Sequence, residues 1–252
     1  MIGVLGGMGP QAGVDLVAKI TAETRASGDQ DHLPVTLLSL PQIPDRTTWL
    51  ADPSAPDPAP AIANGFFRLE AAGAGVAAMA CNTAHTPALF DRVLDLLDDA
   101  GATISVLHLI EETVSGIAFE YPSARRVGIL GTHGTLSSGT YHSVLERHGF
   151  DVIAPADLHR LTHAIYDADA GIKANSESIP AVTREEVLDA IQELNQQGAD
   201  VVILGCTELP LAVRESAVDG LPVVDPARML ARSLIRAVDP QKLVVDLFAS
   251  ES

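Results

Sequence analysis

Short apolar runs alternate along the chain with segments in which apolar residues recur every three or four positions. The runs suit strands buried on both faces of a parallel sheet, and the longer spacing is typical of amphipathic helices. The predicted strands cover 2–5, 35–40, 76–80, 104–107, 127–130, 151–154, the run before Cys206, and 222–224. The predicted helices cover 11–26, 61–72, 87–99, 110–119, 136–148, pieces up to 169, 183–197 and 226–237. This alternation favours an α/β fold.

Two pairs of segments recur at one spacing. Residues 73–81 resemble 198–206, residues 2–10 resemble 127–135, and in both pairs the second copy lies 125 positions further along. A common spacing indicates two halves of like fold. We therefore predict two pseudo-symmetric three-layer domains, each with a mostly parallel four-stranded sheet flanked by helices.

The domain boundaries follow from this repeat. The first half is predicted to contain residues 1–108 plus 225–252, and the second half residues 109–224. A long Pro-rich loop is expected over 41–60, and loops of that length in compact domains are often functional.

Composition narrows the classes of function. Hydrophobic residues make up 47% of the chain and charged residues 19%, which supports a packed core. The net charge of −17 argues against nucleic acid and anionic membranes as partners. We expect neither a signal peptide nor a membrane-spanning helix, and two cysteines that do not form a disulfide framework favour a cytoplasmic location.

The two cysteines, Cys81 and Cys206, occupy equivalent places in the repeat, each at the carboxyl end of a predicted strand. Ligands of open parallel sheets bind at such ends. Asn82 and Thr83 are typical first residues of a helix, so we expect a helix N-terminus that favours the thiolate of Cys81. Each cysteine alone could be a small buried apolar residue, but the matched pair favours two thiols that face one active site between the halves.

Three other patterns carry weaker alternatives. Residues 7–12 fit G-x-G-x-x-A, but the second predicted strand ends without the acidic residue that a dinucleotide site requires. His159 and His163 have the spacing of a metal pair, but no third ligand is evident, so a solvated helix face is preferred. His85 and His133 could orient a thiolate or cap a turn. We predict no cofactor and no bound metal.

Five motifs in order resemble the aspartate/glutamate racemase family, and most closely its branch of aspartate racemases that use no pyridoxal phosphate. They are Met8-Gly9-Pro10, Pro41-Gln42-Ile43-Pro44-Asp45-Arg46-Thr47, Cys81-Asn82-Thr83-Ala84-His85, Gly171-Ile172-Lys173 and Gly205-Cys206-Thr207-Glu208. Glutamate racemases typically have Asp-Ser-Gly near the start and His after the second Cys-Thr, where this chain has Gly6-Gly7-Met8 and Glu208. Gly13 also departs from the threonine that is common in relatives.

The resemblance implies a homodimer with an active site between two α/β halves, and cofactor-independent interconversion of L- and D-aspartate or a related acidic amino acid. Cys81 and Cys206 would be the opposed acid/base pair, since racemisation removes a proton from one face of Cα and returns one to the other. The expected substrate-binding residues are Met8, Arg46, Asn82, Thr83, Thr132, Lys173, Thr207 and Glu208.

Within that set, Arg46 and Lys173 would bind substrate carboxylate, and Asn82, Thr83, Thr132 and Thr207 could hold the α-carboxylate. Two other functions fit the same residues at this stage. One is a cis–trans isomerase or decarboxylase of small dicarboxylates with the same fold. The other is a non-enzymatic protein that binds an acidic metabolite.

Overall fold

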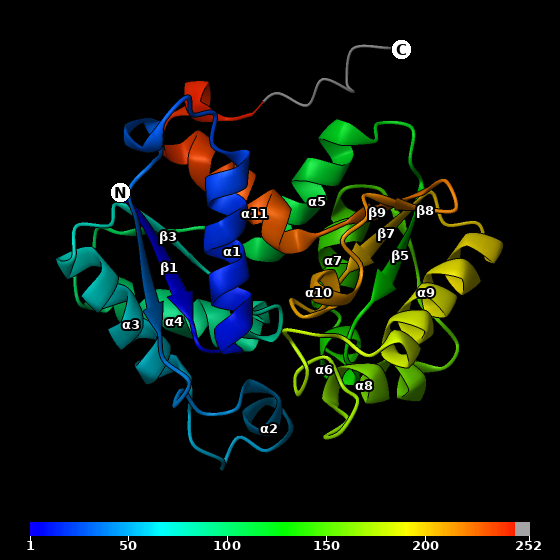
Figure 1. Cartoon of the computed structure of the whole chain (residues 1–252). Coiled ribbons are helices and arrows are strands. Elements are labelled where there is room, and N and C mark those ends of the chain that lie inside the picture. Colours follow the sequence, from blue (N-terminus) through cyan, green and yellow to red (C-terminus); the bar gives the residue numbers. More distant parts are fainter. Residues whose placement is uncertain (245–252) are drawn as a thin grey trace. The chain divides into compact units, whose positions relative to one another are not determined.

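The computed structural model describes residues 1–244. The chain forms two compact units (Figure 1). The second unit runs from Thr113 to Pro226, and the first contains Met1–Glu112 together with the described residues from Ala227 onward. Among the described residues, no helix is both long enough and apolar enough to cross a bilayer.

The first unit is built on a four-stranded parallel sheet in the order β2-β1-β3-β4. Its strands are β1 (Ile2–Gly6), β2 (Val35–Ser39), β3 (Val76–Met79) and β4 (Ser105–Val106). Its helices are α1 (Pro10–Glu23), η1 (Asp29–Asp31), α2 (Arg46–Ala51), α3 (Ala59–Ala71), η2 (Thr83–His85), α4 (Pro87–Asp99), α11 (Pro226–Val238) and η3 (Pro240–Lys242), and α5 (Leu109–Glu120) leads into the second unit.

The second unit contains a five-stranded sheet in the order β6-β5-β7-β9-β8. Its strands are β5 (Arg126–Leu130), β6 (Asp151–Ile153), β7 (Val201–Leu204), β8 (Ala217–Val218) and β9 (Leu221–Val224). Its helices are α6 (His133–Ser137), α7 (Thr140–Arg147), α8 (Leu158–Tyr166), α9 (Ala181–Gln196) and α10 (Leu209–Ala212). The four parallel strands were predicted, but the antiparallel edge strand β8 was missed.

The extra strand comes from a short hairpin. β8 pairs antiparallel with β9, and the turn between them contains Asp219 and Gly220 with φ of 48° and 81°. Asp-Gly is a strong signal for a two-residue hairpin turn, because both positions need positive φ. That dipeptide was therefore the overlooked sign of the fifth strand.

The two sheets share strand order and register, which confirms the two halves of like fold. The order β2-β1-β3-β4 matches β6-β5-β7-β9. Ile2 pairs with Val76 in the first sheet and Val127 pairs with Val201 in the second, so the same 74-residue separation recurs. The 125-residue repeat in the sequence is therefore a repeat of paired strands.

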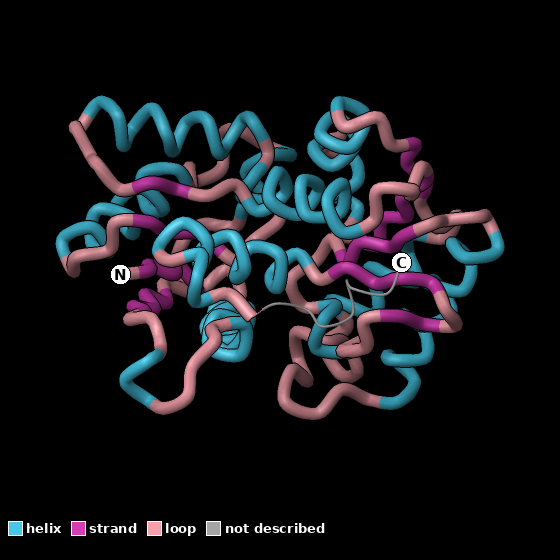
Figure 2. The backbone as a smooth tube through the Cα atoms, turned by 90° about the horizontal axis from the view of Figure 1, so that it is seen from above, coloured by secondary structure: helices cyan, strands magenta, loops and turns pink. Residues whose placement is uncertain are grey.

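Each sheet is covered by helices on both faces, and Figure 2 shows the strands of each unit beside helices. A side chain at Gly3 would meet Leu69 of α3, whereas one at Gly6 would meet Gly13 of α1. Positions 3 and 6 point to opposite faces of a strand, so α1 and α3 lie on opposite faces. By the same test Gly128 faces Leu194 of α9, whereas Gly205, three positions beyond the Val202 that pairs with Gly128, faces Tyr141 of α7.

Several helices begin or end at residues other than those predicted, for local reasons of capping and backbone conformation. The predicted loop over 41–60 contains α2, whose first turn is capped by the Asp45 carboxylate accepting from the Thr48 N–H at 2.7 Å. The predicted helix over 136–148 is split into α6 and α7 at Gly139, which has φ of 65°. A left-handed glycine ends one helix and allows the next to begin in a new direction.

The last described residues, including α11, hydrogen-bond to the end of α1. The buried carboxylate of Glu23 accepts from Nε of Arg228 and from Nη1 of Arg232, each at 2.6 Å. The Val244 N–H donates to the Glu23 carbonyl at 2.9 Å. A buried carboxylate with two guanidinium partners is well compensated, so these bonds hold α11 against α1 within the first unit.

Candidate functional site

The loops after β1 and β2 meet at the carboxyl edge of the first sheet. Gly7 has φ of 101°, and a side chain there would lie 2.4 Å from the backbone of Leu40. Only glycine allows this approach. The turn buries Met8, which is 3% exposed and belongs to the same apolar cluster as Cys81.

Arg46 begins α2 and reaches back to the β1 loop. Its Nη2 donates to the Met8 carbonyl and its Nη1 to the Pro44 carbonyl, both at 3.3 Å. Its Nε is buried without a hydrogen-bond partner in the structure. Among the described residues, no carboxylate forms an ion pair with Arg46. A positioned guanidinium without a carboxylate partner can accept one from a ligand.

Cys81 follows β3 and is buried, with 4% exposure. The next residues form the 3₁₀ turn η2, against which α2 packs, so Arg46 and the Cys81 turn belong to one region of the first unit. Asn82 is buried and Thr83 half-buried. The expected helix N-terminus beside Cys81 is that of η2, with Asn82 at its N-cap position, and α4 begins at Pro87 as predicted, with Thr86 at its N-cap position.

Two histidines hold the backbone of the Cys81 turn. Nδ1 of His85 lies 2.8 Å from the Cys81 carbonyl, and a carbonyl only accepts, so this nitrogen carries the proton. Nε2 of His108 donates to the His85 carbonyl at 3.2 Å, and its Nδ1 accepts from the Glu111 N–H at 3.3 Å. The His85 ring also stacks on Phe90, at 5.0 Å between centroids.

This histidine cluster is uncharged. His85 is fully buried, and burial followed by the neighbouring His108 lowers its pKa from 6.5 to about 3. Burial also lowers the pKa of His108, although Glu111 opposes the shift. His85 therefore fixes the Cys81 turn as a neutral donor and does not act as a cation beside the thiol.

The second unit places Cys206 by a close approach of β5 and β7. The Gly205 N–H donates to the Leu130 carbonyl at 2.5 Å, and a side chain at Gly205 would lie 2.8 Å from that carbonyl. Thr132, just after β5, caps α6 by accepting from the Thr135 N–H. The ring of Tyr141, which is fully buried, packs under Gly205.

Cys206 contacts an acidic side chain that in turn contacts a lysine. The Cys206 thiol donates to Oε2 of Glu208 at 3.1 Å, and Oε1 of Glu208 accepts from Nζ of Lys173 at 2.5 Å. The Thr207 hydroxyl donates to Oε2 at 3.3 Å. Lys173 also lies over the ring of Tyr166, with Nζ 5.4 Å from its centroid. Four of the predicted site residues of this unit are thus joined in one network.

The environment of Cys206 favours the thiol. Burial, followed by the charge of Glu208, raises the pKa of Cys206 well above its ordinary value, and Lys173 opposes this only in part. Burial by itself lowers the pKa of Lys173, but Glu208 and Cys206 raise it above its ordinary value. A carboxylate faces the Cys206 sulfur, and the helix that follows it, α10, has only four residues.

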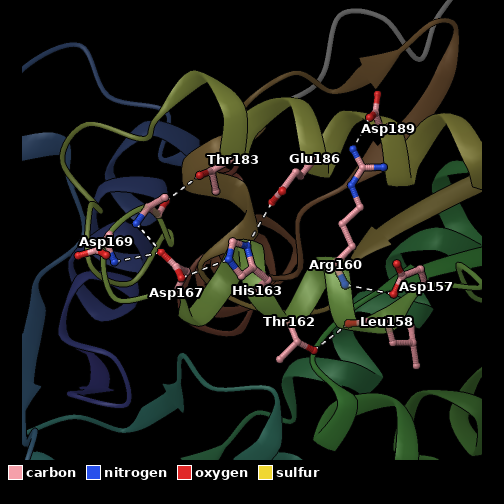
Figure 3. A network of polar contacts seen from close by, with 11 residues as sticks. Asp157, Leu158, Arg160, Thr162, His163, Asp167, Asp169, Thr183, Glu186 and Asp189 are labelled. Carbon is pink, nitrogen blue, oxygen red and sulfur yellow. Dashed lines mark hydrogen bonds and ion pairs between the residues drawn. The ribbon is translucent and has the colours of Figure 1, made fainter.

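The loop that carries Lys173 is braced by polar contacts between α8 and α9 (Figure 3). The Asp167 carboxylate accepts from the Asp169 and Ala170 N–H groups at 3.0 and 2.7 Å. The Thr183 hydroxyl donates to the Ala170 carbonyl at 2.7 Å. The Lys173 N–H donates to the Ile165 carbonyl at 3.1 Å, so the lysine leaves the loop from a fixed backbone.

The weaker sequence alternatives have ordinary structural roles. The turn over 7–12 leads into α1, with Gly9 at the N-cap position and Pro10 as its first residue. His163 lies 3.2 Å from Asp167 and 3.8 Å from Glu186 on the exposed face of α8. Within residues 1–244, no group of three His, Cys, Asp or Glu side chains is placed to hold a metal. His133 is the first residue of α6.

Sequence reasoning missed the groups that surround the cysteines. The Lys173–Glu208 contact joins residues 35 positions apart, and no local pattern predicts it. The role of His108 was also missed, although its position just after β4 places it at the carboxyl edge of the sheet. Tyr141 was also missed, because it lies within a predicted helix and the helical pattern does not single it out.

Comparisons with known proteins agree on one family. The sequence profile described as Asp/Glu/hydantoin racemase matches residues 5–234. The broad-specificity amino-acid racemase RacX of Bacillus subtilis is 30% identical over 248 residues, covering 93% of this chain and 96% of RacX. The structure of the Picrophilus torridus aspartate racemase aligns with a TM-score of 0.80 at 29% identity, covering 98% of this chain and 96% of that chain. An aspartate racemase homologue from Pyrococcus horikoshii aligns with a TM-score of 0.70 at 26% identity, covering 94% and 97%.

Proposed function

Because this chain belongs to the Asp/Glu/hydantoin racemase family and is an amino-acid racemase, we propose that it interconverts L- and D-aspartate by proton transfer at Cα. Cys81 and Cys206 are the proposed acid/base pair. The observation that carries this proposal is their equivalence: each is a free cysteine just beyond the second strand of the repeated pair, β1–β3 or β5–β7. Ligands of parallel sheets bind at that edge.

The proposed chemistry needs two groups on opposite faces of Cα. One sulfur, as thiolate, removes the Cα proton, and the other, as thiol, returns a proton to the opposite face. The carbanion that forms needs hydrogen-bond donors at the α-carboxylate. Asn82 and Thr83 beside Cys81, Thr207 beside Cys206, and Thr132 just after β5, the strand that pairs with β7, are the proposed donors. No cofactor is assigned a role.

Recognition of an acidic side chain is assigned first to Arg46. With a net charge of −17, the protein repels a dicarboxylate at long range, so a close cation is required. Arg46 is held by the carbonyls of Met8 and Pro44, and its buried Nε has no hydrogen-bond partner, which supports its assignment as the group that binds a carboxylate. Lys173, which is paired with Glu208, is the second proposed cation.

The proposal predicts exchange of the Cα proton with solvent. In D₂O, incubation with L-aspartate should produce D-aspartate and should replace the Cα proton by deuterium in the product, because the returned proton comes from an exchangeable thiol. Proton NMR and chiral chromatography measure both. Alanine should react far more slowly, since it lacks the distal carboxylate. Alanine racemised as fast as aspartate would instead support broad specificity, which the similarity to the broad-specificity racemase RacX makes the second candidate.

Replacing Arg46 by alanine should lower kcat/KM for aspartate by the equivalent of about 2–5 kcal/mol, as expected when one partner of a desolvated charge pair is lost. The matched control is Arg25→Ala, which removes the same charge from an exposed position of the same unit. Steady-state kinetics on both variants separate a local contact from a change in net charge. Equal losses in the two variants would contradict the assignment.

The assembly and location are also proposals. We propose a homodimer that acts in the cytoplasm on a free amino acid, with neither nucleic acid nor membrane as a partner. The family resemblance supports the dimer, and the acidic composition supports the choice of ligand class.

A further inference from the structure

The carboxylate of Glu208 lies between a thiol and an ammonium group. Its Oε2 is 3.1 Å from Sγ of Cys206, and its Oε1 is 2.5 Å from Nζ of Lys173. The Glu208 side chain is 6% exposed and that of Lys173 is 31% exposed. The three groups therefore form a short chain from a buried sulfur to a nitrogen that water can reach.

This geometry determines which atom carries the proton. A thiolate 3.1 Å from a carboxylate would place two like charges together in a buried site, which is strongly unfavourable. A thiol in the same place donates a hydrogen bond to the carboxylate instead. The Lys173 ammonium pairs with the carboxylate from its far side, so Oε2 faces the Cys206 thiol while Oε1 faces a positive charge.

The other charged and titratable groups near Cys206 do not change this conclusion. Tyr141 packs from α7, is fully buried and hydrogen-bonds with Thr113, and burial followed by Cys206 and Asp225 raises its pKa well above the ordinary value. Tyr141 is therefore neutral. Tyr166 contacts Lys173 through its ring face. Glu208 and Lys173 are the two charges that act directly on the sulfur.

We propose that Glu208 is a positioning residue that holds Cys206 as the thiol and accepts its proton when the thiolate is needed. The inference rests on the proposed function and deepens it. In the transfer the S–H bond breaks, the electron pair remains on sulfur, and the proton forms an O–H bond to Oε2 of Glu208. The free protein thus begins a turnover with Cys206 as the proton donor.

The same contact explains how the protonation state of Cys206 is restored after a turnover. After one turnover by a two-base mechanism, the base has become an acid and the acid a base, so protons must be exchanged before the same direction can be repeated. Cys206 has 7% exposure and little direct contact with water. The proton on Glu208 then leaves to solvent water beside the more exposed Lys173, whose ammonium already carries three protons and does not itself accept one.

The test measures each thiol separately, without substrate. The wild type, Glu208→Gln and Lys173→Met are treated with iodoacetamide from pH 6 to pH 10, and the modified peptides of Cys81 and Cys206 are quantified by mass spectrometry. The midpoint of each rate profile reports the thiol pKa, and the plateau reports access.

The two substitutions should move the Cys206 midpoint in opposite directions. Glu208→Gln removes the facing negative charge and should lower it by about one pH unit or more, so that alkylation near neutral pH becomes roughly tenfold faster. Lys173→Met removes the opposing positive charge and should raise it. The Cys81 profile should stay constant in both variants and serves as the internal control for folding.

A Cys206 midpoint that is unchanged or raised in Glu208→Gln, with a normal Cys81 profile, would overturn the inference. If Glu208→Gln disturbs both profiles, Glu208→Asp keeps the charge and should restore a midpoint above that of the glutamine variant; failure to do so also overturns it. The second readout is the rate of racemisation as a function of pH. The part of that profile that reports the Cys206 pKa should shift by the same amount as the alkylation midpoint. Failure of aspartate racemisation in the wild type would overturn the proposed function while leaving the thiol measurement interpretable.

Discussion

Cys81→Ala and Cys206→Ala should each reduce racemisation of the wild-type substrate by about 10²–10⁴-fold or more, since each removes one of two essential acid/base groups. Each substitution deletes only a sulfur atom from an apolar cluster and should cost on the order of 1 kcal/mol of folding free energy. Chiral chromatography measures the activity, and circular dichroism with thermal melting checks that the variants remain folded.

The single-cysteine variants should also differ in which enantiomer they exchange. A protein with one remaining sulfur can remove a Cα proton and return a deuteron to the same face, without inversion. The Cys206→Ala variant should therefore exchange the Cα proton of one enantiomer, and Cys81→Ala that of the other. Near wild-type racemisation by either variant, or exchange of the same enantiomer by both, would contradict the two-base assignment.

Acidification should destabilise the protein through His85. The folded protein holds this pKa at about 3, against 6.5 for the ordinary group, so below pH 6.5 the unfolded chain binds a proton that the folded chain does not. The contribution is fully present above pH 6.5 and is lost as the pH falls toward 3. At 1.36 kcal/mol per unit, the free energy of unfolding should fall by roughly 2–3 kcal/mol between pH 7 and pH 4.5 from this residue alone.

Urea unfolding of the wild type and His85→Phe at these two pH values measures this contribution. Phenylalanine keeps a ring that can stack on Phe90, loses the bond to the Cys81 carbonyl and cannot be protonated. The variant should be less stable at pH 7 but should lose clearly less stability on acidification. His148→Gln removes an exposed histidine and is the matched control. An equal pH-dependent loss in wild type and His85→Phe would show that His85 does not carry the effect.

Local sequence signals were sufficient for the framework of the fold. The apolar runs located four strands in each half, because strands buried on both faces are continuously apolar. The repeated segments that begin at residues 2 and 127 and at residues 73 and 198 predicted two halves of like fold, and in each half they contain the paired central strands. The apolar runs that precede Cys81 and Cys206 were sufficient to place both cysteines at strand ends. The Asp219-Gly220 turn was also present in the sequence and was overlooked.

Tertiary structure alone decided the state of the proposed site groups. The charge environment of Cys206 depends on Glu208 and Lys173, and the neutrality of His85 depends on burial against Phe90 and His108. A thiol or an imidazole titrates according to its desolvation and to charges a few ångströms away, and residues that supply both can be distant in the sequence. The sequence therefore determined which residues could do acid/base chemistry, while packing determined which of them are charged.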